Sequence, residues 1–203
     1  MEVRLARIIS FLLHPVFLPF YMLLFLFSMN FHAALVLTPK AKLFLAIVVM
    51  LTTILIPLLL NLIFLRMKLI QSLRMETREE RIFPLITQVI FFYLTYYLLK
   101  QYQVPFIFTF YMLGATFLVF CTLVITLFYK ISLHMTGMGG VFGFFLGLAL
   151  KYSLPMADIL MIIILISGIT GVARLKENSH KNSEIYAGFL AGTVLMMALF
   201  LLL

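Results

Sequence analysis

The amino-acid sequence predicts an all-α fold, a polytopic transmembrane bundle of about six to seven spanning helices. The chain of 203 residues is 65% hydrophobic and only 11% charged, and its mean hydropathy is +1.18. Most of it divides into apolar runs of the roughly 17 to 25 residues that a helix needs to cross a hydrocarbon core. Soluble globular domains do not have this composition. We therefore expect an integral membrane protein.

Seven apolar runs are candidate spans. They lie at about residues 8–31, 41–65, 84–99, 105–129, 132–151, 156–173 and 185–203. The first run follows Arg4 and Arg7, as in a signal peptide, but it is too long for one and no cleavage site of small residues follows it. We expect it to be a retained helix, with bends at His14–Pro15 and at Pro19.

The seven runs are expected to form a single domain over residues 1–203. No repeat, Gly/Ser linker or low-complexity tail separates them. The one cysteine, Cys121, lies inside an apolar run, which excludes a disulfide within the chain and a cysteine metal cluster. Gly139, Gly143 and Gly147 recur every four residues and predict a smooth stripe for close helix packing.

The charged residues are divided unevenly between the two membrane faces that seven crossings would define. The face that holds the N-terminus carries eleven of the 15 Lys and Arg residues, and six of the seven acids. The eleven are Arg4, Arg7, Arg66, Lys68, Arg74, Arg78, Arg81, Lys130, Arg174, Lys176 and Lys181. The net charge is +8, and the basic residues lie between the apolar runs and not in a soluble domain. Membrane lipids with anionic or phosphorylated headgroups are therefore the expected partners, and nucleic acid is not.

Three polar segments meet on that face, and the first is LRMETREERIFP, residues 73–84. Arg74 and Arg81 are seven positions apart, so a helix through both would place them on one side after two turns. The same segment also fits an interfacial amphipathic helix, with Leu69, Ile70 and Leu73 on its apolar side. Both interpretations stay open from the sequence.

The second segment is KISLHMTGMGG, residues 130–140, in which Ser132 and His134 come directly before a glycine-rich helix start. Backbone amides at the N-terminus of a helix lack partners inside the helix and carry partial positive charge, which suits a phosphate group. The glycine stripe has its own explanation in helix packing. Packing does not explain the histidine.

The third segment, ARLKENSHKNSEIYAG, contains Arg174, His180 and Glu184 before the last apolar run. His180 and Glu184 would share a helical face if that helix begins early, and the carboxylate would then fix the imidazole tautomer and raise its basicity. The alternative is an ordinary solvated loop in which Lys176, Glu177 and Lys181 are surface charges. The segment alone does not decide between the two.

Together the three segments resemble the type 2 phosphatidic acid phosphatase superfamily of membrane lipid phosphate phosphatases. The signature of that family is K-x6-R-P, then P-S-G-H, then S-R-x5-H-x3-D. Arg74-x6-Arg81 resembles the first motif, with arginine for lysine and the proline displaced to position 84. Ser132-x-His134 resembles the second, with isoleucine and leucine at the positions of its proline and glycine.

Arg174-x5-His180-x3-Glu184 resembles the third motif, with alanine for its serine and glutamate for its aspartate. The resemblance covers about residues 74–184. It implies a phosphoric ester hydrolase in which His180 forms a phosphohistidine and Glu184 orients it. His134 would protonate the leaving oxygen and later activate water.

The resemblance also implies that Arg74, Arg81 and Arg174 hold the nonbridging phosphate oxygens, with Ser132 and nearby amides completing the cradle. No metal or other cofactor is expected, because the arginines supply positive charge and no carboxylate cluster is available for magnesium. The expected substrate is a phosphorylated lipid, such as phosphatidate, phosphatidylglycerophosphate, an isoprenyl phosphate or diphosphate, or a lipid A phosphate.

Two alternatives to a phosphatase remain from the sequence, a lipid-binding scaffold and a transporter. A catalytically inactive scaffold or anionic-lipid-binding protein of the same fold would need the arginines but not both histidines. A small transporter has less support, since no spanning run carries an acid or base at mid-membrane apart from His14, which lies near a predicted end. The resemblance implies a bacterial inner (plasma) membrane with the site on its outer side, whereas the positive-inside rule places the motifs in the cytoplasm.

Overall fold

The computed structural model describes residues 2–29, 32–73, 75 and 77–202. These residues form helices and connecting turns, without a strand among them, which confirms the all-α fold class. Six helices within the described ranges are long and apolar enough to cross a membrane. They are Pro39–Arg66, Glu79–Gln101, Phe106–Phe128, Leu133–Tyr152, Ala157–Lys176 and Asn182–Phe200. The chain is therefore an integral membrane protein with a polytopic helical fold.

The helices divide into two compact units, and we describe each by itself. The terminal unit consists of Met1–Pro15 and Phe128–Leu203, so it contains both ends of the chain. The central unit is Val16–Leu127. The expectation of one domain over the whole chain stays a prediction.

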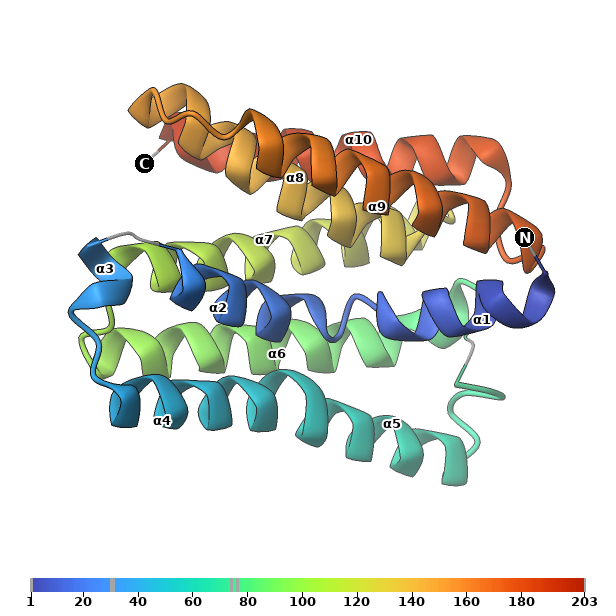
Figure 1. The fold of residues 1–203 in the computed structure, drawn as a ribbon. Helices are drawn as coiled ribbons and strands as arrows, with labels where there is room; N and C mark the ends of the chain where they lie inside the picture. Colours follow the sequence, from blue (N-terminus) through green and yellow to red (C-terminus); the bar gives the residue numbers. More distant parts are fainter. Residues whose placement is uncertain (1, 30–31, 74, 76, 203) are drawn as a thin grey trace. The chain divides into compact units, whose positions relative to one another are not determined.

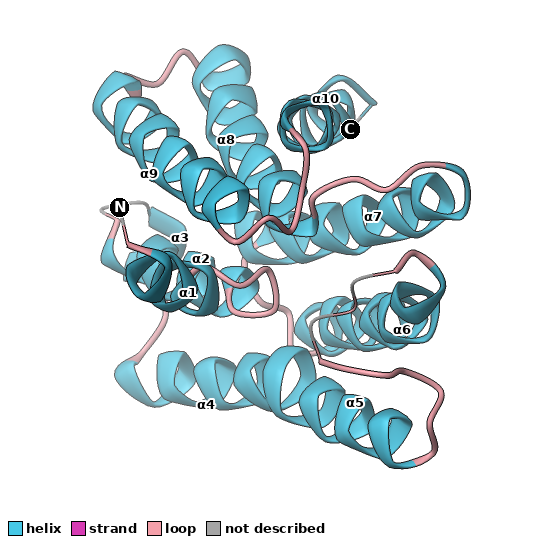
Figure 2. Ribbon diagram, turned by 90° about the vertical axis from the view of Figure 1, so that its right-hand side faces the viewer, coloured by secondary structure: helices cyan, strands magenta, loops and turns pink. Residues whose placement is uncertain are grey.

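Helices from both ends of the chain form the described part of the terminal unit (Figure 1). They are α1 (Val3–Leu12), α8 (Leu133–Tyr152), α9 (Ala157–Lys176) and α10 (Asn182–Leu202). Helix α8 packs against both α9 and α10, and α1 packs along α9 (Figure 2). The beginning of α8, the end of α9 and the beginning of α10 lie at the same end of this unit.

The α8–α10 contact is a close approach of two backbones. A Cβ atom added at Gly139 or Gly143 would overlap the α10 backbone, and one added at Gly147 would overlap the ring of Phe200. The hydroxyl of Thr193 on α10 reaches the main-chain oxygen of Gly139 at 3.2 Å. The prediction of a glycine stripe for close helix packing is confirmed, because only residues without a Cβ atom let the two helices come this near.

The central unit contains the remaining helices. They are α2 (Leu18–Ser28), α3 (His32–Leu35), α4 (Pro39–Met50), a π-helical turn (Leu51–Leu55), α5 (Ile56–Arg66), α6 (Glu79–Gln101) and α7 (Phe106–Phe128). The π-helical turn joins α4 to α5 in one continuous span. Its threonines face α6, where the hydroxyl of Thr95 donates to that of Thr52 at 2.7 Å and the amide of Gln88 donates to the Thr53 carbonyl at 3.3 Å.

The first apolar run differs from the prediction. Residues 8–31 do not form one helix, because α1 ends at Leu12 and α2 begins only at Leu18. The expected bend at His14–Pro15 is confirmed and is a full break, since Pro15 has no backbone N–H and disfavours helical geometry in the residue before it. Pro19 instead lies in the first turn of α2, where proline is tolerated.

Candidate functional site

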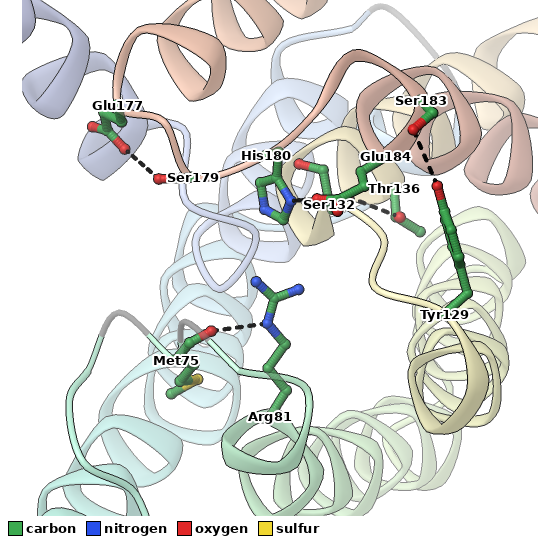
Figure 3. A network of polar contacts seen from close by, with 10 residues as sticks. All are labelled: Met75, Arg81, Tyr129, Ser132, Thr136, Glu177, Ser179, His180, Ser183 and Glu184. Carbon is green, nitrogen blue, oxygen red and sulfur yellow. Dashed lines mark hydrogen bonds and ion pairs between the residues drawn. The ribbon is translucent and has the colours of Figure 1, made fainter.

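The side chains of His180 and Glu184 form a direct pair in the terminal unit. His180 precedes the first residue of α10, and its Nδ1 lies 2.6 Å from Glu184 Oε2 (Figure 3). The side chain of His180 is 2% exposed and that of Glu184 is 13% exposed. A carboxylate can only accept, so Nδ1 carries the hydrogen and the lone pair of a neutral ring is on Nε2. The predicted contact is confirmed, although the helix begins after His180.

Ser132 connects this pair to the start of α8. Its main-chain N–H donates to the carbonyl of Glu184 at 3.1 Å, and its carbonyl accepts from the hydroxyl of Thr136 at 3.0 Å. Ser132 is buried, and its Oγ has no hydrogen-bond partner within the described part of the chain. Figure 3 shows it beside the histidine and the glutamate. A buried hydroxyl in this state is available to a ligand that enters the same space.

His134 lies in the first turn of α8 and is buried. Its Nε2 is 2.9 Å from the main-chain oxygen of Ser10 in α1. Its ring also meets the ring of His14 edge to face, with centroids 5.1 Å apart and an interplanar angle of 84°. The sequence identified His134 but not these two partners. The sequence signals near these partners are the bend expected at His14–Pro15 and the ionisable side chain of His14, and neither indicates a contact with His134.

Arg174 lies in the last turn of α9 and is held by a neighbouring carboxylate. Its Nη1 is 2.6 Å from Glu177 Oε2, and both side chains are 13% exposed. The hydroxyl of Ser179 reaches the same carboxylate oxygen at 3.4 Å (Figure 3). The interpretation of Glu177 as a solvated surface charge is therefore wrong. Its carboxylate contacts the arginine because Glu177, which directly follows the last residue of α9, keeps helical geometry, and residues three positions apart are neighbours on a helix.

The charge of Arg174 also affects His14, which lies in the turn after α1 and outside the six candidate spans. Burial, followed by the nearby positive charge of Arg174, lowers the pKa of His14 to about 4. At neutral pH the His14 ring is therefore uncharged. It contacts His134 as an aromatic group and adds no positive charge next to it.

Arg81 belongs to the central unit, and Arg74 lies outside the described residues. Arg81 is buried in the first turn of α6, and its Nε donates to the main-chain oxygen of Met75 at 3.0 Å (Figure 3). The predicted helix through both arginines is wrong, because α6 begins only at Glu79. The participation of these two arginines in the site stays a prediction.

The segment before α6 is a folded loop, and Glu80 explains why. Its carboxylate accepts from the main-chain N–H of Gln71 at 2.7 Å and from that of Thr77 at 3.3 Å. These bonds hold the chain in turns over the described residues between 67 and 78, so the alternative prediction of an interfacial amphipathic helix is also wrong. A buried carboxylate satisfied by backbone donors competes here with helix formation.

The terminal unit therefore brings together five of the seven predicted site residues. They are Ser132, His134, Arg174, His180 and Glu184. Within the described ranges, no group of three or more His, Cys, Asp or Glu side chains is arranged to hold a metal ion. The groups available for chemistry here are two imidazoles, the guanidinium of Arg174 and the buried hydroxyl of Ser132 at the start of α8. One carboxylate contacts His180 and another contacts Arg174.

Comparison with known proteins adds no relative on which this arrangement could be mapped. The chain matches no protein-family model, no curated protein and no solved structure.

Proposed function

We propose that this protein is a metal-independent membrane phosphatase that hydrolyses a lipid phosphate through a phosphohistidine on His180. The observation that carries the proposal is the 2.6 Å contact between His180 Nδ1 and Glu184 Oε2 in a nearly buried setting. The carboxylate fixes the ring with its lone pair on Nε2 and stabilises the positive charge that develops when that nitrogen attacks phosphorus. A solvated loop histidine would have neither property.

The reaction consists of two displacements. In the first, Nε2 of His180 bonds to phosphorus while the ester P–O bond breaks, and His134 gives a proton to the departing oxygen. In the second, His134 takes a proton from water, the water oxygen bonds to phosphorus and the P–N bond breaks. The products are an alcohol and inorganic phosphate, and both histidines return to their starting states.

Three groups in the same unit are suited to hold the nonbridging oxygens. Arg174 supplies a fork of charged donors, Ser132 a buried hydroxyl, and the first turn of α8 its backbone amides. Glu177 forms an ion pair with Arg174 at 2.6 Å. A phosphate that binds this guanidinium would therefore compete with the carboxylate.

The substrate is proposed to be a phosphorylated lipid, because of where these residues lie on the helices. Ser132 precedes α8, Arg174 is in the last turn of α9, and His180 precedes α10. All three are at the ends of apolar helices long enough to span a membrane. A phosphate at that level would come from an amphiphile whose acyl or isoprenyl chains remain in the bilayer.

The decisive experiment is a phosphate-release assay of the purified protein against a panel of lipid phosphates in the presence of a chelator. We expect turnover that the chelator does not change, and its loss in His180→Ala. Turnover that disappears with the chelator and returns only with magnesium would overturn the histidine mechanism. Binding of anionic lipid vesicles without turnover of any lipid phosphate would instead identify an inactive lipid-binding protein.

A further inference from the structure

Helix α1 ends in a way that leaves one backbone carbonyl for a partner outside the helix. The N–H of Leu13 donates to Ile9 O at 2.9 Å, but that of His14 donates to Phe11 O at 3.2 Å. A continuing α-helix would have directed the His14 N–H to Ser10 O. Since Pro15 cannot supply an N–H to Phe11, the last turn tightens and Ser10 O loses its donor from the helix.

His134 of α8 uses this carbonyl. Its Nε2 lies 2.9 Å from Ser10 O, between residues 124 positions apart in the chain. A carbonyl oxygen only accepts, so Nε2 must carry a hydrogen in every protonation state that keeps this bond. The neutral ring therefore has its lone pair on Nδ1. The edge-to-face contact with His14 restrains the same ring from a second direction.

We propose that the end of α1 is a positioning element of the site, in which the Ser10 carbonyl holds His134 as the Nε2–H tautomer and makes Nδ1 the atom that moves the proton. The inference deepens the proposed function and depends on it for the catalytic role. Ser10 and His14 act through His134 and do not take part in the bond changes themselves.

The consequence for the reaction is one defined proton path. Protonated His134 donates the Nδ1 hydrogen to the ester oxygen as the bond from that oxygen to phosphorus breaks. The neutral ring that remains keeps its Nε2 hydrogen on Ser10 O. The Nδ1 lone pair then takes a proton from the water that attacks the phosphohistidine, which restores the cation. Without the carbonyl, the neutral ring would populate both tautomers, and in one of them Nδ1 could not act as the base.

The tautomer is measurable without turnover. The full-length protein, labelled with 15N in its four histidines and placed in lipid nanodiscs at pH 8.5, would be examined by long-range 1H–15N correlation spectra. His134→Gln identifies the His134 signals. We expect Nε2 to appear as a protonated nitrogen and Nδ1 as an unprotonated one. A protonated Nδ1, or a single averaged signal for both nitrogens, would overturn the assignment.

The role of the main chain requires a change to the Ser10 carbonyl. Replacing Phe11 by its α-hydroxy acid converts the Ser10–Phe11 amide into an ester, whose carbonyl accepts hydrogen bonds less well. The same replacement at Ile8 removes one N–H from α1 but leaves the Ser10 carbonyl unchanged. Both side chains are exposed, so neither change disturbs a buried contact of the side chain.

We expect the Phe11 ester to give averaged tautomers of His134 and the Ile8 ester to retain the fixed one. With an alkyl lipid phosphate, kcat of the Phe11 ester should fall about threefold to tenfold at unchanged KM, as for the loss of one ordinary hydrogen bond. Identical spectra for the two esters would overturn the positioning role. A fixed tautomer in a protein that hydrolyses no lipid phosphate would leave the tautomer assignment standing, while the proposed function and the catalytic role of α1 would both fall.

Discussion

The two histidine regions of the terminal unit differ in what holds each ring. A carboxylate, Glu184, contacts His180 at 2.6 Å, whereas a backbone carbonyl, that of Ser10, contacts His134 at 2.9 Å. A carboxylate stabilises a positive charge on its imidazole, which suits a ring that carries a phosphoryl group. A neutral carbonyl chiefly selects the tautomer, which suits a ring that gives and takes a proton. The difference predicts different defects when each ring is removed.

The largest effect is expected from His180→Ala. Without the nucleophile no phosphoenzyme can form, so turnover should fall below detection, a loss of at least about 1000-fold. Acid quenching after mixing with a 32P-labelled lipid phosphate should trap labelled protein in the wild type and none in the variant. Labelled protein in His180→Ala would show that a different residue accepts the phosphoryl group.

His134→Ala should produce the opposite pattern in the same experiment. Loss of the general acid should slow the first step, measured as alcohol release in a single turnover, by about 100-fold to 10,000-fold for alkyl phosphates. An activated aryl phosphate should lose much less in this step, because its leaving group needs no proton. With the aryl substrate the labelled phosphoenzyme should accumulate, because the second step still needs a base. Equal losses in the first step for both substrates would contradict the role of His134.

The pH dependence of stability tests the environment of His14. The pKa of this buried ring is lowered from 6.5 to about 4, so between these values the unfolded chain binds a proton that the folded protein does not. The contribution of His14 to stability should therefore be fully present above pH 6.5 and be lost as the pH decreases towards 4, by up to roughly 3.4 kcal/mol. Thermal unfolding in detergent measures this, and His14→Phe should flatten the curve.

His32 provides the matched control, since its side chain is exposed in the central unit. His32→Phe should leave the pH dependence of the melting temperature as in the wild type. If His14→Phe and His32→Phe gave the same curve as the wild type, the loss of stability at low pH would come from other groups.

The smallest effect concerns Glu177, which contacts Arg174 at 2.6 Å. Glu177→Gln keeps the shape of the side chain but removes its charge, so a phosphate mimic should bind with less competition. We expect vanadate to inhibit the variant at about fivefold lower concentration, which corresponds to roughly 1 kcal/mol. Lys176→Gln is the control. It changes the charge of a nearby side chain that, as a cation, does not compete with phosphate for Arg174. Unchanged or weaker inhibition of Glu177→Gln would mean that phosphate does not use Arg174.

Local patterns predicted much of the fold for reasons that the structure makes clear. The last six apolar runs became spanning helices, because a hydrophobic stretch of that length must satisfy its backbone groups internally wherever it lies in lipid. The glycine stripe could be predicted because residues four positions apart lie on the same face of a helix. The conformation of the segment before α6 could not be predicted, because it depends on the hydrogen bonds from Gln71 and Thr77 to the carboxylate of Glu80.

By itself, the sequence determined the all-α class, the last six apolar runs as spanning helices and a bend at His14–Pro15, since each depends on residues close together in the chain. It offered the His180–Glu184 contact as one of two interpretations, and the structure decided for that contact. Only the tertiary structure decided that the end of α1 contacts His134, more than a hundred positions away. The sequence indicates that Pro15 ends the helix and leaves a backbone carbonyl without its helical donor. It does not indicate which side chain will bind that carbonyl. Packing of α1 and α8 in one unit selects that partner, because a buried imidazole must find an acceptor among the groups that surround it.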